Sequence, residues 1–321
     1  MHRRPTPPLL PGWLLAALLA LMLLAHAGTA DAQPARLSAT GYPHADAIRF
    51  TPVHPLWSDG TSKRRWIRVP TGRTIDARDP DAWVFPVGTQ VWKEFAYGSR
   101  IETRYLERRA NGWVYATYVW RADGLDADLA PAQGVRALPV ADAPDGRYAI
   151  PSQDDCRACH AGARTPVLGF GALQLGDALP ALIERGLIRH APAAWRSAPP
   201  RIAGDSDDER AARGYLHGNC GHCHHETGVP VPLVLAQRTD GAVRAMSPQH
   251  LATALRRMGT RNPYVQMPPI GTRTTDPHGL ALVRAWAERR DGLAAPQPDN
   301  PSALAARITE HLEQTGAHTV R

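Results

Sequence analysis

All four cysteines of the chain lie in two short clusters that could do cofactor chemistry. Each cluster has two cysteines three positions apart, followed directly by a histidine: Cys156, Cys159, His160 and Cys220, Cys223, His224. This C-x-x-C-H order is the attachment sequence of c-type haem. The two thiols reach the two vinyl groups of one porphyrin, and the histidine ligates its iron. The sequence therefore predicts two covalently bound haem c groups, with His160 and His224 as iron ligands.

Three other chemistries use paired cysteines. Structural disulfides fit an exported protein, but the very short C-x-x-C loop restricts the unfolded chain little. A four-cysteine zinc site needs its two pairs closer together than Cys159 and Cys220 are. A redox-active pair needs a thioredoxin-like strand and helix around it, which the sequence does not indicate. Haem attachment is the interpretation we favour.

A methionine is the expected sixth ligand of the second haem iron. Met267 lies in the proline-rich segment 266–271, after His224 and before the last strongly predicted helix. A stiff loop holds a weak thioether ligand at little entropic cost. The alternative for Met267 is core packing, which is the expected role of Met258. Met246 is a weaker candidate for the iron.

The sixth ligand of the first haem stays open at this stage. No methionine lies between His160 and the next predicted helix. The candidates are His190, His217, His54 and Met258, or an iron without a sixth ligand.

The first residues have the layout of a secretory signal peptide. Arg3 and Arg4 precede an apolar run over residues 9–25, and a small-x-small cleavage site ends at Ala32. Such a signal would export the protein to the periplasm, where cleavage would release it, whereas an uncleaved segment would act as a membrane anchor. No later segment is apolar enough to span a membrane. The net charge is +7, but we expect no nucleic-acid partner, because an exported protein rarely meets one.

The fold class expected from the sequence is α+β with several domains. Residues 33–147 carry short aromatic and β-branched runs at 65–69, 90–97, 101–108 and 113–121, separated by turn residues. Asn111-Gly112 is a strong hairpin signal. These features predict an antiparallel β sandwich or barrel.

The chain after this β domain is expected to be a mostly α, cytochrome c-like dihaem region. Residues 148–204 would form an incomplete first haem-attachment segment, and residues 205–292 a cytochrome c domain with the second haem. Cap residues at Ser206, Ser247 and Asp276 predict helix starts, and Ser206 with Glu209 predicts a capping box at the first of them. A C-terminal tail with a short helix would follow at 293–321.

Several short motifs resemble a family of bacterial periplasmic dihaem c-type cytochromes with an N-terminal β domain. They span roughly residues 45–290 and include PLWSDG at 55–60, FPVGT at 85–89 and both C-x-x-C-H clusters. A further segment, Leu173–Leu175, also fits, although this chain has Gly176 where the family pattern has asparagine. The resemblance implies a haem protein of the cell envelope.

The leading functional interpretation is a relay of single electrons between periplasmic or membrane redox proteins, so we do not expect catalytic residues. One alternative is a dihaem oxidoreductase or peroxidase-like enzyme with an open first haem. Another is a ligand-binding β domain with a cytochrome redox arm, in which His44, His54 and Asp59 could form a metal site.

Overall fold

The structure is a computed structural model that describes residues 33–291. The predicted signal peptide (1–32) and C-terminal tail (293–321) lie outside the described residues.

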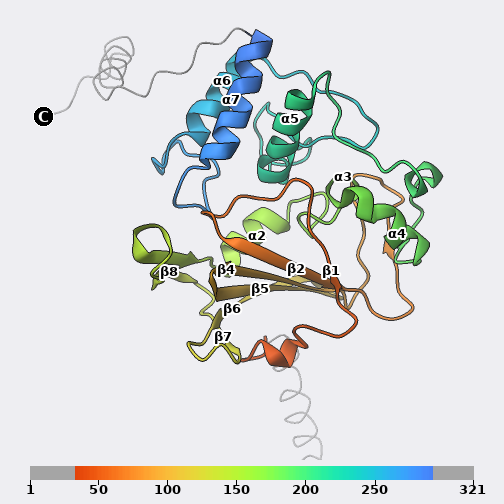
Figure 1. Cartoon of the computed structure of the whole chain (residues 1–321). Helices are drawn as coiled ribbons and strands as arrows, with labels where there is room; N and C mark the ends of the chain where they lie inside the picture. The colour runs from red at the N-terminus through yellow and green to blue at the C-terminus, as the bar shows by residue number, and fades with distance from the viewer. Residues whose placement is uncertain (1–32, 292–321) are drawn as a thin grey trace, which may run out of the picture.

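A six-stranded antiparallel sheet dominates the described chain (Figure 1). In spatial order its strands are β1 (Ile48–Arg49), β2 (Ser62–Arg68), β4 (Gln90–Tyr97), β5 (Ser99–Arg109), β6 (Gly112–Trp120) and β7 (Ala127–Leu129). The four predicted strands match β2, β4, β5 and β6. The predicted hairpin joins β5 and β6, with its turn at Ala110 and Asn111, because Gly112 already pairs with Arg109.

Two small sheets accompany the large one. β3 (Ile75–Asp76) pairs in parallel with β10 (Ile188–Arg189), and β8 (Val135–Pro139) pairs with β9 (Arg147–Ile150). Short 3-10 turns lie at Ser38–Thr40, Pro144–Gly146, Gly176–Ala178 and Ala193–Arg196.

The helices follow the sheet in sequence: α2 (Gln153–His160), α3 (Ala172–Leu175), α4 (Leu179–Glu184), α5 (Asp207–Cys220), α6 (Pro248–Met258) and α7 (Pro277–Asp291). The predicted starts of α5, α6 and α7 are confirmed, since Ser206, Ser247 and Asp276 each accept a hydrogen bond from the backbone N–H three residues on. Glu209, however, binds the N–H of Asp205 and not that of Ser206, so the predicted capping box is only half formed. Within residues 33–291 no helix combines the length and apolarity needed to cross a bilayer.

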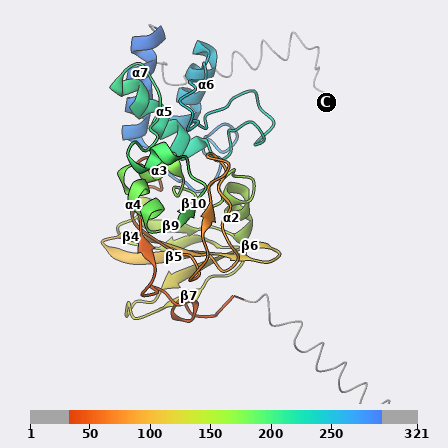
Figure 2. The ribbon, with the colours of Figure 1, turned by 90° about the vertical axis from the view of Figure 1, so that its right-hand side faces the viewer.

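Side chains alternate between the two faces of the sheet because successive strand residues point in opposite directions. One face, which we call the helix-side face, carries Ile67, Val91, Leu106 and Tyr115 and packs against Phe170 and the helices of residues 172–195. The opposite face carries aromatic residues such as Trp92 and Tyr118, which pack around Leu37 from the N-terminal segment. Helices α2 to α7 all lie on the helix-side face (Figures 1 and 2).

A second apolar core joins the three longer helices. Ala212 and Leu216 of α5 pack with Leu251 and Leu255 of α6. From α7, Val283, Trp286 and Ala287 complete this helical core.

The predicted fold class is wrong in both parts. The large sheet is single and open, with β1 and β7 at its two edges, so it forms neither a sandwich nor a barrel. No second large sheet is needed because the N-terminal segment covers one face, and the short helices with the small β3–β10 sheet cover the other.

The predicted mostly α, cytochrome-like region is also wrong. Residues 148–204 contribute two strands and three short helices to the sheet's surroundings and share its core. Helices α5, α6 and α7 have 14, 11 and 15 residues, so less than half of residues 205–291 is helical. The described chain is β-rich and has no mostly α, cytochrome-like region.

Phe170 ties this middle segment to the sheet, and its removal tests the shared core. Its ring is fully buried and lies 4.9 Å from Phe50 and 6.2 Å from both Trp83 and Phe85, between ring centroids. We expect Phe170→Ala to lower the free energy of unfolding by about 3–5 kcal/mol because it leaves a cavity. Urea unfolding measures the change. Leu125→Ala, at a side chain that is 82% exposed, is the control, and equal midpoints for both variants would contradict the shared core.

Candidate functional site

The first cysteine cluster forms helix α2, which lies over strand β6 of the sheet. A complete capping box starts this helix, because Ser152 accepts the N–H of Asp155 and the Asp155 carboxylate accepts the N–H of Ser152. Cys156 packs against the sheet core, and the His160 ring lies 5.6 Å from that of Tyr115. The cluster is thus fixed on the sheet at both of its ends.

The imidazole of His160 is oriented by one hydrogen bond. Its Nδ1 lies 2.7 Å from the carbonyl oxygen of Pro166. A carbonyl oxygen only accepts, so Nδ1 must carry the proton. Burial lowers the pKa of His160 to about 3, and the ring is therefore neutral. Its Nε2 keeps a free lone pair, which is the state that a metal ligand requires.

The second cluster repeats this arrangement at the C-terminal end of α5. Nδ1 of His224 donates to the carbonyl oxygen of Leu233 at 3.2 Å, and burial lowers the pKa of His224. Its own carbonyl oxygen accepts the N–H groups of Leu235 and Ala236, which ties the following loop to the cluster. Both histidines thus present a neutral imidazole with Nδ1 occupied and Nε2 available.

The four cysteines are free thiols. Burial raises the pKa of each thiol, to about 11 at Cys159 and about 12 at Cys220. Redox-active C-x-x-C pairs have a lowered thiol pKa, so these surroundings are unlike theirs.

The two clusters are neighbours in space although they are far apart in sequence. The charge of Cys223 contributes to the raised pKa of Cys159, after burial. The charge of His222 likewise contributes to the lowered pKa of His160. Groups shift one another's pKa in this way only at short range, so the structure brings the two C-x-x-C-H clusters together.

Met267 lies at the second cluster. It lines a cavity together with Cys220, Trp57 and Tyr215. Its backbone is held on both sides, because its N–H donates to the carbonyl of Arg257 and its carbonyl accepts the Arg261 guanidinium. Met258 lines the same cavity but is buried in the helical core, whereas Met246 packs only at the edge of that core.

The PLWSDG segment joins the sheet to the second cluster. Asn219, directly before Cys220, accepts the N–H of Trp57 at 2.7 Å and donates to the carbonyls of Pro55 (3.4 Å) and Tyr215 (3.0 Å). Asn219 is only 4% exposed. The sequence motif therefore has a structural role that its residue types alone do not reveal.

Asp59, in the same segment, fixes the chain between Met267 and α7. Its carboxylate accepts the N–H groups of Arg273 and Thr274 and the hydroxyl of Thr274, at 2.9–3.0 Å. It is thus occupied by the loop that follows Met267. His44 pairs with Asp46 instead, and His54 lies against α5, so the predicted metal site of His44, His54 and Asp59 is not assembled.

The close fit of His54 on α5 depends on two glycines. A Cβ atom at Gly214 would lie 2.2 Å from Cε1 of His54, and one at Gly218 would lie 2.3 Å from its carbonyl oxygen. Any other residue at these positions would push the 50–60 loop away from the second cluster.

Two other candidates for the first iron are also engaged elsewhere. His190 pairs with Asp76 at 2.9 Å on an exposed edge beside β3. Nδ1 of His217 accepts the N–H of Gln237, so Nε2 of a neutral His217 carries the proton and has no free lone pair.

The segment at 173–176 braces the same loop. The side-chain oxygen of Gln174 accepts the N–H of His54, and its backbone carbonyl accepts that of Val53. Gly176 has a φ of 50°, and a Cβ there would lie 2.7 Å from the Val53 side chain. The departure from the family pattern at Gly176 thus fits a tight contact in this chain.

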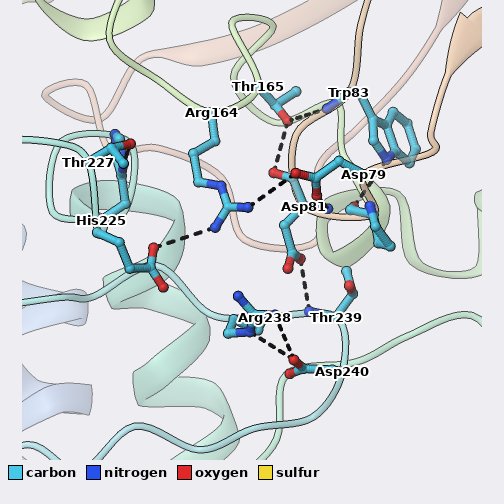
Figure 3. Close-up of polar contacts among 12 residues, drawn as sticks. Asp79, Asp81, Trp83, Arg164, Thr165, His225, Thr227, Arg238, Thr239 and Asp240 are labelled. Atoms are coloured by element: carbon cyan, nitrogen blue, oxygen red, sulfur yellow. Dashed lines mark hydrogen bonds and ion pairs between the residues drawn. The ribbon is translucent and has the colours of Figure 1, made fainter.

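A cleft lies between the loop that follows the first cluster and the residues around the second. Its lining includes Arg164, Gln174, His217, His222 and Glu226. At its edge Arg164 pairs with Asp79 and Glu226, and Asp81 accepts the N–H of Thr239 (Figure 3). Ion pairs therefore join three distant segments around this cleft.

His222 is a candidate that the sequence analysis missed. It lines the cleft, its Nδ1 is buried without a hydrogen-bond partner, and burial lowers its pKa to about 4. Its position between two cysteines made it look like a spacer of the motif. The nearness of His222 to His160 could not have been found without the fold.

No protein-family model, curated protein or solved structure matches the chain. The resemblance to dihaem cytochromes remains a prediction. Among residues 33–291 no group of three or more His, Cys, Asp and Glu side chains is arranged to hold a metal ion by itself.

Asn219 offers a test of how the second cluster is held. Asn219→Ala removes its three hydrogen bonds and leaves the N–H of Trp57 without an acceptor. We expect the free energy of unfolding to fall by about 1–3 kcal/mol, with faster amide exchange in residues 55–60, measured by mass spectrometry. Asn262→Ala, at an exposed loop residue, is the matched control. Unchanged exchange at 55–60 would show that Asn219 does not hold this segment.

Proposed function

We propose that the protein is a periplasmic dihaem c-type cytochrome that relays single electrons between redox proteins. The observation that carries the proposal is the shared geometry of His160 and His224. Each donates its Nδ1 proton to a backbone carbonyl and keeps Nε2 free. A metal-bound histidine characteristically makes such a bond, which fixes the tautomer and the ring orientation. Two unrelated loops supply the two carbonyls, so the repetition is not a consequence of a shared fold.

The residues of each cluster have distinct roles in this proposal. The thiols of Cys156 and Cys159 hold one haem, and those of Cys220 and Cys223 hold the other. Nε2 of His160 and Nε2 of His224 ligate the irons. When bound, each haem supplies an iron that changes reversibly between the ferric and ferrous states.

Met267 supports this assignment for the second haem. The thioether belongs to the lining of the same cavity as Cys220, and the backbone bonds to Arg257 and Arg261 keep it there. A methionine opposite a histidine raises the reduction potential of a haem. We therefore assign Met267 as the sixth ligand of the second iron.

The nearness of the two clusters favours a relay. Clusters close enough for the charge of Cys223 to act on Cys159 suit electron transfer within one chain, and the basic net charge of +7 would steer acidic partners toward the protein. The partners would be periplasmic or membrane redox proteins, reached after export by the predicted signal peptide or from a retained anchor.

The cleft beside His222 favours a second candidate function. A substrate bound there would lie between the loop that follows the first cluster and His222, whose charge acts on His160, and an oxidoreductase with an open first haem would need its substrate near His160. Carbon monoxide separates the two functions, because it binds a ferrous haem only where a coordination position is open. Two low-spin haems that do not bind carbon monoxide would support the relay, whereas carbon monoxide binding at one haem would support catalysis.

Mass spectrometry tests the proposal directly. After acid extraction the mature polypeptide should retain two haem masses, because thioether bonds survive this treatment. Cys156→Ser/Cys159→Ser should retain one haem. Recovery of the wild-type chain without added mass, as free thiols or cystines, would refute haem attachment.

Met267→Ala tests the sixth ligand. We expect the midpoint potential of one haem to fall and its spectrum to become high-spin, because the weak ligand is lost. Potentiometric titration followed by absorbance measures both changes. Met246→Ala is the control, since Met246 lies outside the cavity lining. Identical potentials in wild type and Met267→Ala would exclude Met267 as a ligand.

A further inference from the structure

Three cations stand side by side on the helix-side face of the sheet. Arg65 of β2 lies directly opposite Lys93 of β4, and Lys93 lies directly opposite Arg104 of β5. We call these three residues the cationic row. Like charges placed opposite each other across strands destabilise a sheet. An arrangement of this kind needs a compensating anion.

Residues 33–291 place one carboxylate, that of Glu102, beside the row. Glu102 is fully buried, and its Oε1 accepts both the Arg104 guanidinium and the hydroxyl of Tyr148. Glu94 belongs to the opposite face, where it pairs with Arg64 and Tyr42. The described residues therefore place one negative charge beside the three positive charges of the row.

Among residues 33–291 neither Arg65 nor Lys93 forms an ion pair, although the charge of Glu102 acts on Lys93. Arg65 is 5% exposed, and the Lys93 ammonium lies 4.8 Å from the centroid of the Phe95 ring. Burial lowers the pKa of Arg65 to about 10 and that of Lys93 well below its usual value; the charges of Arg65 and Arg104 lower the pKa of Lys93 further, and the charge of Glu102 raises it. A buried charge without an ion pair, such as that of Arg65, is costly, and the half-buried Lys93 lies directly beside it.

The row lies beside the first cysteine cluster. It adjoins the apolar row Ile67, Val91, Leu106 and Tyr115, against which Cys156 packs. The charge of Arg104 acts on Cys156, and the charges of Lys93 and Arg104 act on Cys159 and His160. A group attached to Cys156 and Cys159 would therefore lie next to the cations.

We propose that the cationic row binds the propionate carboxylates of the haem attached at the first cluster. This inference rests on the proposed function, because it assumes that haem is attached. Carboxylates pair well with guanidinium and ammonium groups, especially away from water. Such a group would give Arg65 and Lys93 an ion-pair partner, which residues 33–291 do not provide. The sheet would then be one wall of the first haem site.

The test uses the full-length holoprotein with Arg65→Gln and Lys93→Gln. We expect the midpoint potential of one haem to fall in each variant, since losing a nearby positive charge favours the ferric state. The propionate-bending band in the resonance Raman spectrum should shift for the same haem. Arg68→Gln is the matched control, because Arg68 lies on β2 but on the opposite face, where it binds Gln90. Lys93→Arg should preserve both signals.

The outcomes separate the two proposals. Two haem masses with unchanged potentials and Raman bands in the Gln variants would overturn the propionate site and leave haem attachment intact. A wild-type chain without haem mass would overturn both. Added inorganic phosphate distinguishes the source of the anion, because a wild-type potential that responds to phosphate would assign the row to a solution anion instead. Should Lys93→Gln fail to fold, Arg65→Gln and Lys93→Arg provide the same comparison.

Discussion

The position of the second cluster depends on the contact between the 53–60 loop and helix α5. Asn219 binds the backbone at Pro55 and Trp57, and Gly214 and Gly218 leave room for His54 against the helix. Hydrogen bonds form only at short distances and over a narrow range of angles. The bonds of Asn219 therefore determine both the distance and the orientation between the sheet and the helical core. The cavity at Cys220 and Met267, the cleft beside His222 and the nearness of the two cysteine clusters all depend on this contact.

The pKa values of the histidines and cysteines around the clusters follow from the same packing. Burial keeps His160, His217 and His222 neutral, because nearby cations and a low dielectric disfavour a further positive charge. Burial also raises the thiol pKa values and so keeps the cysteines protonated. Cysteines that exchange disulfides have lowered pKa values instead. The cationic row belongs to this environment, and its charges act on the first cluster across the face of the sheet.

Local features were predictable from the sequence because their causes are local. The strands at 90–97 and 113–121, the hairpin that joins β5 and β6 and the caps at Ser206 and Ser247 depend on a few neighbouring residues. The architecture was not predictable in this way. Alternating strands require a cover on each face but do not say whether a sheet, a helix or a loop provides it. Here the N-terminal segment around Leu37 covers one face, and Phe170 with short helices and the small β3–β10 sheet covers the other. The carbonyl partners of His160 and His224, and the exposure of His222 to the cleft, depend on loop paths that no short pattern encodes.

The two clusters are anchored on different cores, and this separation has a functional consequence. Cys156 packs against the sheet core, whereas Cys220 packs against the helical core. Each cluster is anchored on its own core, so the packing between the two cores sets the distance from one cluster to the other. A relay needs that distance to stay constant, and the hydrogen bonds of Asn219 and Asp59 together with the ion pairs of Arg164 oppose any opening. An enzyme that admits a substrate to the cleft would need this interface to open. The hydrogen bonds and ion pairs that cross the interface oppose opening, and for this reason we favour electron transfer over catalysis as the proposed function.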